Sequence, residues 1–256
     1  MSELEVGLDA GVLRLTLNRP DHFNALSSDM VVGLLTELRD ATGRDDVRVV
    51  LLTGTGAAFS AGADLEGDRP QEKYDGGSVD AANVLIRAIL ELDKPVVCGL
   101  NGIAAGVGMS VALACDLIVA KQSAALTLAF TGIGLMPDGG ATATVAASVG
   151  RARAMRLALT SDVLGAQEAY DAGLVTHVFA DDDYDAGLAK VVDRLAKGAP
   201  LAFAATKKAV NAATLGGLED AFARERAGQS VLLRTEDVGE GMRAFLEKRR
   251  PAFQGR

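Results

Sequence analysis

The sequence is poor in the residues on which several kinds of site depend. It contains no tryptophan, two histidines and two cysteines, and aromatic residues make up 4% of the chain. The two cysteines, Cys98 and Cys115, give no disulfide framework, so nothing indicates an oxidising compartment. The sequence has neither metal-ligand spacing nor a phosphate-loop motif, and the scarcity of histidine disfavours a Ser-His-Asp triad. We therefore expect no metal site.

Positive charge is also scarce. The net charge is -8, and no block of lysine or arginine occurs before the last few residues, which disfavours a nucleic-acid partner. The acidic first residues, MSELEVGLDA, lack the basic and apolar regions of a secretory signal, so we expect a cytoplasmic protein. Residues 95–115 are uncharged over about the length of a bilayer span. Their glycines, Pro95 and Asn101 instead favour a buried strand, a glycine loop and a buried helix, and we expect no membrane partner.

Apolar residues are abundant, at 49% of 256 residues, which is enough for one domain with a substantial core. The first half of the chain alternates strand patterns, such as VLRLTL and VRVVLLTG, with helical spacing of apolar residues. The polar residues 66–80 predict a loop, which is either a cover over a pocket or a surface excursion. The predicted strands are 12–17, 47–54, 95–100, 116–120 and 125–129, and the predicted helices are 27–41, with a serine cap, 81–92 and 107–114.

From about residue 140 the predicted elements are helices, apart from one short strand at 174–179. The predicted helices are 140–149, 151–160, 166–172, 184–197, 200–213, 217–232 and 236–249. The sequence has no linker and no low-complexity tract. It therefore predicts an α/β body followed by a helical C-terminal part.

Two glycine-bearing loops follow two of the buried strands. They lie in VVLLTGTGAAFSAGADL and PVVCGLNGIAAGVGMSVAL, and each can present a backbone N–H that no side chain obstructs. Two such N–H groups converging on one oxygen would form an oxyanion hole, aided by the positive end of the following helix. Tight packing of the two turns explains the glycines equally well, so the spacing by itself leaves both interpretations open.

Five segments resemble motifs of the crotonase (enoyl-CoA hydratase/isomerase) family, in the family's order and at similar spacings. They are GTGAAFSAGADL, NGIAAGVGMSVALACDLIVA, IGLMPDGGAT, GAQEAYDAGLV and GMRAFLEKRRPAF. The resemblance implies an α/β fold, with a spiral of ββα units over residues 1–195 and a C-terminal helical trimerisation region over residues 196–256. It also implies a homotrimer or a homohexamer built as a dimer of trimers. The implied substrate is an acyl-CoA thioester, with coenzyme A as part of that substrate and no prosthetic group.

The resemblance also assigns the catalytic positions. Its two oxyanion N–H donors correspond to Ala63 and Val107. Hydratase members of the family carry two glutamates that grip a water molecule, and these positions hold Ser110 and Phe130 here. Neither side chain can act as the base that addition of water requires. Ordinary hydration is therefore a less favoured interpretation.

Asp138, in LMPDGGAT, remains as a candidate acid/base. Some branches of the family place a working aspartate at this position, among them ring-1,2-epoxyphenylacetyl-CoA isomerases and, as a nucleophile, chlorobenzoyl-CoA dehalogenases. One base suffices for an isomerase, which can move a proton between two carbons. Alternatively, Asp138 caps a helix that begins at Gly139 or Gly140, and both roles can hold together. Asp116 is interpreted as a structural turn residue.

Coenzyme A contacts are implied at both ends of the chain. The implied cofactor-binding residues are Phe23, Ala25, Ala61, Asp64, Leu65, Phe245 and Lys248, the last two reaching the cofactor of a neighbouring subunit. A lysine that is often found two residues beyond the aspartate of AGAD is Glu66 here, so Lys248, Arg249 and Arg250 could supply the missing charge. The basic run could instead complement the negative end of its own helix.

The resemblance does not fix the acyl pocket. Leu85, Met109 and Phe130 could line it, or could simply be core residues. Ser110 could position the substrate, or its hydroxyl could bond back to its own helix. Together with the resemblance, the sequence thus predicts an enoyl-CoA isomerase or a related acyl-CoA isomerase with one working aspartate. The alternatives are an enoyl-CoA hydratase (lyase) of fatty-acid degradation and a non-catalytic acyl-CoA-binding protein.

Overall fold

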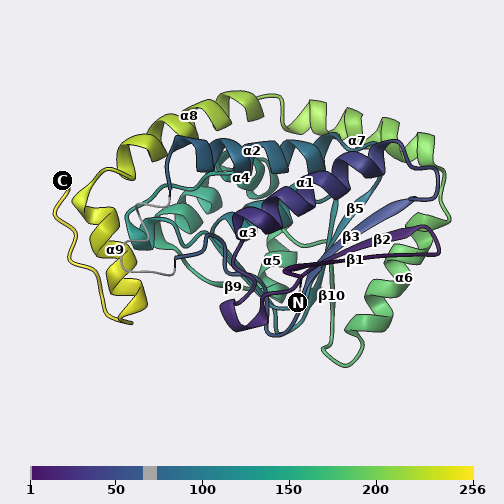
Figure 1. The fold of residues 1–256 in the computed structure, drawn as a ribbon, viewed down its shortest axis with the longest axis horizontal. Coiled ribbons are helices and arrows are strands. Elements are labelled where there is room, and N and C mark those ends of the chain that lie inside the picture. The colour runs from purple at the N-terminus through teal and green to yellow at the C-terminus, as the bar shows by residue number, and fades with distance from the viewer. Residues whose placement is uncertain (1, 66–73) are drawn as a thin grey trace.

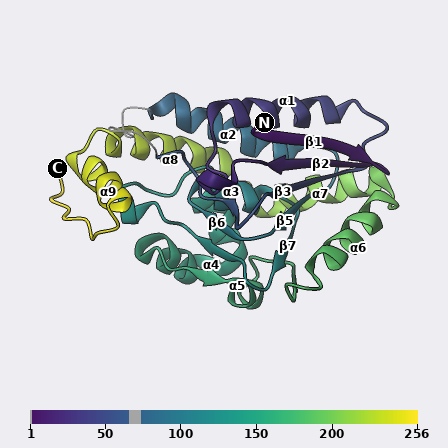
Figure 2. The ribbon, with the colours of Figure 1, turned by 60° about the horizontal axis from the view of Figure 1, so that its bottom comes forward.

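The computed structural model describes residues 2–65 and 74–256, and it contains two sheets surrounded by helices (Figure 1, Figure 2). The larger sheet has the strand order β1-β2-β3-β5-β7-β10 and is parallel except for the β1–β2 pair. Its strands are β1 (Leu4–Asp9), β2 (Val12–Leu17), β3 (Val49–Gly54), β5 (Val96–Leu100), β7 (Leu117–Lys121) and β10 (His177–Phe179). The smaller sheet has the order β4-β6-β8-β9, with β8 and β9 antiparallel. Its strands are β4 (Ala58–Ser60), β6 (Ile103–Ala105), β8 (Ala125–Thr127) and β9 (Leu164–Gly165).

The chain passes repeatedly from the larger sheet to the smaller sheet and then into a helix. Strands β3 and β4 lead to α2 (Gly76–Glu91), β5 and β6 to α3 (Val107–Ala114), and β7 and β8 to α4 (Ala141–Thr160). Each turn therefore adds one parallel strand to each sheet, and the ββα spiral predicted from the sequence is confirmed. The two glycine loops follow β4 and β6, which pair with each other, so the spiral stacks the loops side by side.

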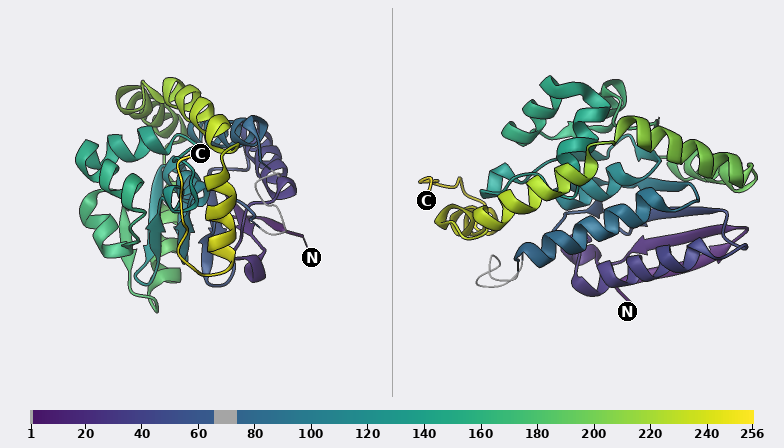
Figure 3. Two further views of the ribbon diagram at one scale, coloured as in Figure 1. Left: turned by 90° about the vertical axis from the view of Figure 1, so that its left-hand side faces the viewer. Right: turned by 90° about the horizontal axis from the view of Figure 1, so that it is seen from above.

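The larger sheet is covered on both faces, which explains its unbroken apolar strands. In β3, Val50 and Leu52 belong to the main core, whereas Val49 and Leu51 belong to a second cluster on the opposite face. The second cluster is closed by Leu188 and other residues of α6 (Tyr184–Ala196). The main core lies beneath α1 (Ser28–Thr42), α2 and α3, and α1, α2 and α8 (Leu218–Leu232) lie side by side over it (Figure 3).

Several of the helices lie close to their predicted bounds. Ser27 caps α1 as expected, because its hydroxyl accepts a hydrogen bond from the Met30 N–H at 3.1 Å. The other helices are α5 (Ala166–Ala172), α7 (Pro200–Thr214), α9 (Glu236–Leu246) and the short 3-10 helices η1 (Pro20–His22) and η3 (Thr131–Ile133). Helix α7 has no buried residue, whereas α8 buries Ala221, Phe222, Glu225 and Gln229.

Several predicted boundaries were wrong. Residues 76–80 were expected in a loop, but α2 begins at Gly76 because Asp75 and Ser78 form a capping box. The predicted helices 140–149 and 151–160 are a single element, α4, interrupted by Gly150 with φ 74° and ψ 165°. The predicted strand 174–179 is shorter, and α9 ends at Leu246 rather than residue 249. Strands β1, β4, β6 and β9 were not predicted.

No helix in the described part of the chain is long and apolar enough to cross a membrane. Among the same residues, no group of three or more histidine, cysteine, aspartate or glutamate side chains could hold a metal ion.

Candidate active site

The two glycine loops are in direct contact. A Cβ atom on Gly62 would lie 2.6 Å from the Ala105 carbonyl oxygen and 3.4 Å from the Val107 nitrogen. A Cβ atom on Gly108 would lie 2.6 Å from the Ser60 carbonyl oxygen. Both glycines are therefore required by the close approach of the backbones, and Gly62 also has φ +92°. The packing interpretation of these glycines is correct, and the same packing brings Val107 next to the loop that contains Ala63.

The two N–H groups implied as oxyanion donors are held in different ways. Val107 is the first residue of α3, so its N–H is one of those that no helix carbonyl can accept. Ala63 forms an isolated parallel bridge with Leu26, and the Leu26 N–H donates to the Gly62 carbonyl oxygen at 2.8 Å. The first loop is thereby fixed by hydrogen bonds, and the second by the start of a helix whose dipole favours negative charge.

Asp138 lies close to the start of α3. The Ser110 hydroxyl, one turn into α3, donates to the Asp138 carbonyl oxygen at 2.7 Å. A Cβ atom on Gly139 would lie 3.0 Å from the Ser110 Cβ, so the aspartate segment and α3 are in contact. The expectation that the Ser110 hydroxyl bonds back to its own helix is wrong, because this longer-range acceptor lies within reach.

Asp138 is 8% exposed, and its carboxyl accepts a hydrogen bond from Gln229 Nε2 at 2.7 Å. Burial raises the pKa of Asp138 from 3.8 to about 7; the Gln229 hydrogen bond lowers this pKa, and the negative charge of Glu225 raises it. A carboxyl with a pKa near neutrality can both accept and return a proton, which is the property that a single acid/base requires.

The helix-cap interpretation of Asp138 is wrong. Helix α4 begins at Ala141 after Gly140, which has φ 76°, and no side chain of its own segment caps it. The Glu225 carboxylate of α8 instead accepts hydrogen bonds from the N–H groups of Gly140 at 2.7 Å and Thr142 at 2.9 Å. Because α8 supplies the acceptor for the helix terminus, the Asp138 carboxyl is not used for this structural task.

The two positions where the resemblance implies glutamates are apolar or already bonded. Phe130 is 6% exposed, and its Cζ lies 3.9 Å from the position of a Cβ on Gly106, directly before Val107. Leu85 and Met109 are each 1% exposed and, with Phe130, belong to the main core. The three are therefore core residues in this structure, and a role for them in an acyl pocket stays a prediction.

The segments implied for coenzyme A are joined by backbone hydrogen bonds. Ala61 and Phe23 are both exposed residues, and the Ala61 N–H donates to the Phe23 carbonyl oxygen at 2.9 Å. Ala25 is 6% exposed, so its side chain offers little surface to a ligand. Asp64 forms an ion pair with Arg19 at 3.1 Å, and Arg19 also donates to the Ala25 carbonyl oxygen at 2.8 Å.

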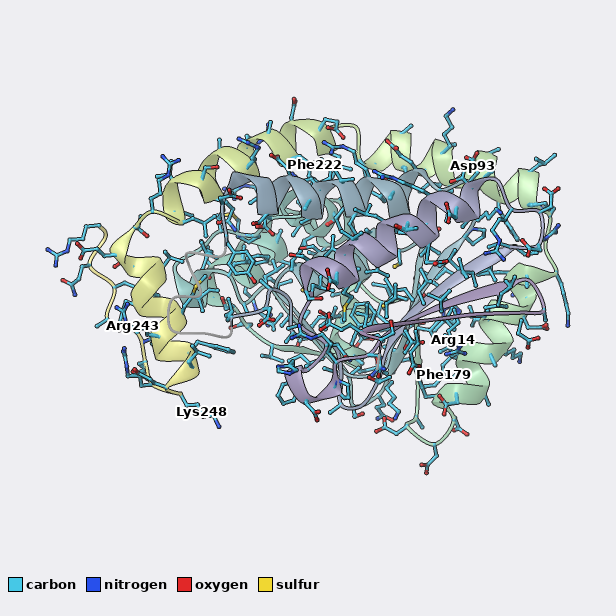
Figure 4. All side chains as sticks on the ribbon, viewed as in Figure 1. Arg14, Asp93, Phe179, Phe222, Arg243 and Lys248 are labelled. Carbon is cyan, nitrogen blue, oxygen red and sulfur yellow. The ribbon has the colours of Figure 1, made fainter. Side chains whose placement is uncertain are left out.

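The other residues implied to contact coenzyme A differ in exposure and in their partners. Leu65 is half-buried, and Glu66 lies outside the described residues. Phe245 is exposed in the last turn of α9, and Lys248, just beyond this helix, is exposed at its lower end in Figure 4. Arg249, one of three residues that could supply charge to the cofactor, forms ion pairs with Glu240 and Glu247 of its own C-terminal segment.

Sequence reasoning missed Arg19, Glu225 and Gln229. Arg19 lies in a turn and gave no periodic signal. Glu225 and Gln229 are charged or polar residues in the sequence ARERAGQS, which is typical of a solvent-exposed helix face. Both are buried, at 0% and 2% exposure, because α8 packs against α2 and α4. The expected structural role of Asp116 agrees with the geometry, since its carboxylate accepts from the Val96 N–H and pairs with Lys207.

Comparison with known proteins gives one consistent result. The profile of the family described as enoyl-CoA hydratase/isomerase matches residues 7–256. The chain is 41% identical over 251 residues to a probable enoyl-CoA hydratase of Rhodobacter capsulatus, covering 97% of this chain and 96% of the relative. It is 37% identical over 255 residues to the 1,2-epoxyphenylacetyl-CoA isomerase of Escherichia coli, covering 97% of each.

A crystal structure of an enoyl-CoA hydratase from Mycobacterium avium subsp. paratuberculosis superimposes with a TM-score of 0.93 at 46% identity, over 99% of both chains. The family profile, the full-length relatives and the ββα spiral agree. The chain belongs to the enoyl-CoA hydratase/isomerase family.

Proposed function

We propose that this protein is an acyl-CoA isomerase that uses Asp138 as its single acid/base and the Ala63 and Val107 N–H groups as an oxyanion hole. The observation that carries the proposal is the Asp138 carboxyl. It is buried beside α3, it has a pKa raised to about 7, and the capping of α4 does not use it. Buried ionisable groups with strongly perturbed pKa values are concentrated at functional sites.

The proposed reaction moves a proton along the acyl chain. The thioester carbonyl oxygen accepts hydrogen bonds from the two backbone N–H groups, which stabilise the negative charge that develops on it. The ionised Asp138 takes a proton from one carbon, the carbonyl becomes an enolate, and the carboxyl returns a proton to a different carbon as the double bond shifts. No atom is gained or lost, and the carboxyl ends in its starting state.

The neighbouring side chains favour one base over two. The Ser110 hydroxyl donates a hydrogen bond to the Asp138 main-chain carbonyl oxygen, and Phe130 has no ionisable group. Addition of water requires groups that orient and deprotonate the water and protonate carbon. The 37% identity to a 1,2-epoxyphenylacetyl-CoA isomerase agrees with an isomerase that acts on a related thioester.

Hydration is the second candidate, because the names of relatives favour it. Besides the probable enoyl-CoA hydratase, the chain is 37% identical over 257 residues to a 2,3-dehydroadipyl-CoA hydratase of Escherichia coli. Under this alternative, Asp138 would have to deprotonate the water and also protonate the carbon.

The test is incubation with 2-enoyl, 3-enoyl and aromatic CoA thioesters, followed by mass spectrometry and ultraviolet absorbance. A shifted double bond at constant mass is expected. A mass gain of one water would establish the hydratase instead, and binding of every thioester without turnover would exclude both enzymes in favour of a non-catalytic acyl-CoA-binding protein.

A further inference from the structure

Helix α8 carries two buried polar side chains that face the aspartate segment. Glu225 and Gln229 are one helical turn apart and are 0% and 2% exposed. Helix α8 lies over α2 and α4 (Figure 1). An ion pair between Arg226 and Asp80 joins α8 to α2. The position of α8, and hence of these two side chains, is set by packing with the core.

The orientation of the Gln229 amide is determined by its two partners. Its Oε1 accepts a hydrogen bond from the Met136 N–H at 3.1 Å, and its Nε2 donates to Asp138 Oδ2 at 2.7 Å. A backbone N–H can only donate, so the amide oxygen must face Met136 and the amide nitrogen must face the carboxyl. One glutamine thus holds the segment on both sides of Pro137.

We propose that Gln229 is a positioning residue for Asp138. Resting on the function proposed above, it keeps Oδ2 occupied as a hydrogen-bond acceptor and directs the mobile proton to Oδ1. Oδ1 accepts no hydrogen bond from any residue that the structure describes. The proton therefore leaves and returns at one defined oxygen, and the carboxyl plane cannot rotate away from the substrate without breaking the Gln229 hydrogen bond.

The groups around the Asp138 carboxyl determine how its pKa should change when Gln229 is replaced. Gln229 stabilises the ionised form of Asp138, which lowers its pKa, while burial and the charge of Glu225 raise it. Glu225 is the charged group that acts on Asp138 among the residues described, and it is itself held by the N–H groups of Gly140 and Thr142. Removal of the Gln229 donor should therefore raise the pKa of Asp138 further.

Two variants test this role. Gln229→Met removes both hydrogen bonds, whereas Gln229→Glu keeps the size and an acceptor for the Met136 N–H but replaces the donor by a second carboxyl. We expect the pKa of Asp138 to rise by about one unit in Gln229→Met, the effect of one hydrogen bond to a charged group. The rise should be larger in Gln229→Glu, because two adjacent carboxyls share a proton.

The protonation state is measured by infrared titration of the carboxylic acid band, identified by its absence from Asp138→Asn. The pH profile of kcat is measured in parallel. The ascending limb of this profile should move up by the same interval, which lowers kcat about fivefold at pH 7 in Gln229→Met, approaching about tenfold at lower pH, with KM nearly unchanged. The matched control is Gln167→Met, which removes a glutamine bonded to Asp171 at 2.9 Å on the exposed face of α5. It should change neither readout.

The outcomes separate the two proposals. A rise in both the infrared pKa and the kinetic pKa supports the positioning role. An unchanged infrared pKa in both folded variants overturns it, even if Asp138 is the base. A raised infrared pKa with an unchanged rate profile shows that Asp138 is not the base, and it overturns the proposed function together with the positioning role.

Discussion

Replacement of Asp138 by asparagine separates the proposed chemistry from the structural role of the residue. Asparagine has nearly the same size, and its carbonyl oxygen can accept the Gln229 hydrogen bond that the carboxyl accepts at 2.7 Å. The main-chain carbonyl that receives the Ser110 hydroxyl is unaltered. Because Glu225 caps α4, the substitution removes no helix cap. The folded structure should therefore survive, while proton transfer is lost.

The effect of this substitution on stability can be worked out from the pKa. The folded pKa of Asp138 is raised from 3.8 to about 7, so the folded state binds more protons than the unfolded state between these values. The contribution of Asp138 to the stability of the parent protein should therefore be fully present below about pH 4 and be lost as pH rises toward 7. A difference of about three units corresponds to at most about 4 kcal/mol. Asp138→Asn lacks this dependence and should be at least as stable as the parent at neutral pH.

Although Asp138→Asn should not destabilise the protein, it should slow the reaction. Loss of a general base lowers the rate by a factor on the order of 10² to 10⁴. The assay is exchange of the substrate protons at C2 or C4, followed by NMR in deuterated water, with melting curves to confirm that each variant is folded. Ser110→Ala and Phe130→Leu are measured beside it and should retain most of the exchange.

Exchange by Asp138→Asn at the parent rate would refute the assignment of the base. If Ser110→Ala were the variant that abolished exchange, the working group would lie in α3 instead. If the stability of the parent protein relative to Asp138→Asn, measured by denaturant unfolding, did not fall between pH 4 and pH 7, the raised pKa would be wrong even if the activity data agreed.

Three further predictions concern assembly, cofactor binding and the glycine loops. The protein should be a trimer or hexamer at micromolar concentration, because α7 buries none of its residues within one chain and Leu201 on it is 85% exposed; light scattering that shows a monomer would contradict this. Lys248→Glu should weaken binding of a CoA thioester by about 1–2 kcal/mol, and more strongly at low salt, and an unchanged affinity by calorimetry would remove Lys248 from the site. Gly108→Ala should lower the free energy of unfolding by about 1–3 kcal/mol, because its Cβ would lie 2.6 Å from the Ser60 carbonyl oxygen. Gly43→Ala, whose Cβ would meet nothing within 4 Å, is the control, and equal stability of the two variants would argue against the close packing of the loops.

The sequence by itself determined the elements whose residues carry a local signal. The unbroken apolar run of β3, the helical spacing in α1 and α5, and the two glycine loops were all predictable, because periodicity and chain reversal depend on neighbouring residues. Ordered motifs also indicated the family and singled out Asp138 as the carboxyl to test. Strands β4, β6 and β9 were not predictable, since two or three residues are too few to show a period of two.

Only the tertiary structure decided how Asp138 is held. Its carboxyl partner Gln229 lies 91 positions further along the chain, and Glu225, which caps α4, lies 85 positions from Gly140. Both belong to a helix whose composition predicts a solvent-exposed face, and nothing local indicates that α8 packs against α2 and α4. A buried polar group requires a hydrogen-bond partner, but the sequence does not say which one. That choice depends on contacts between distant segments, which exist only once the chain has folded.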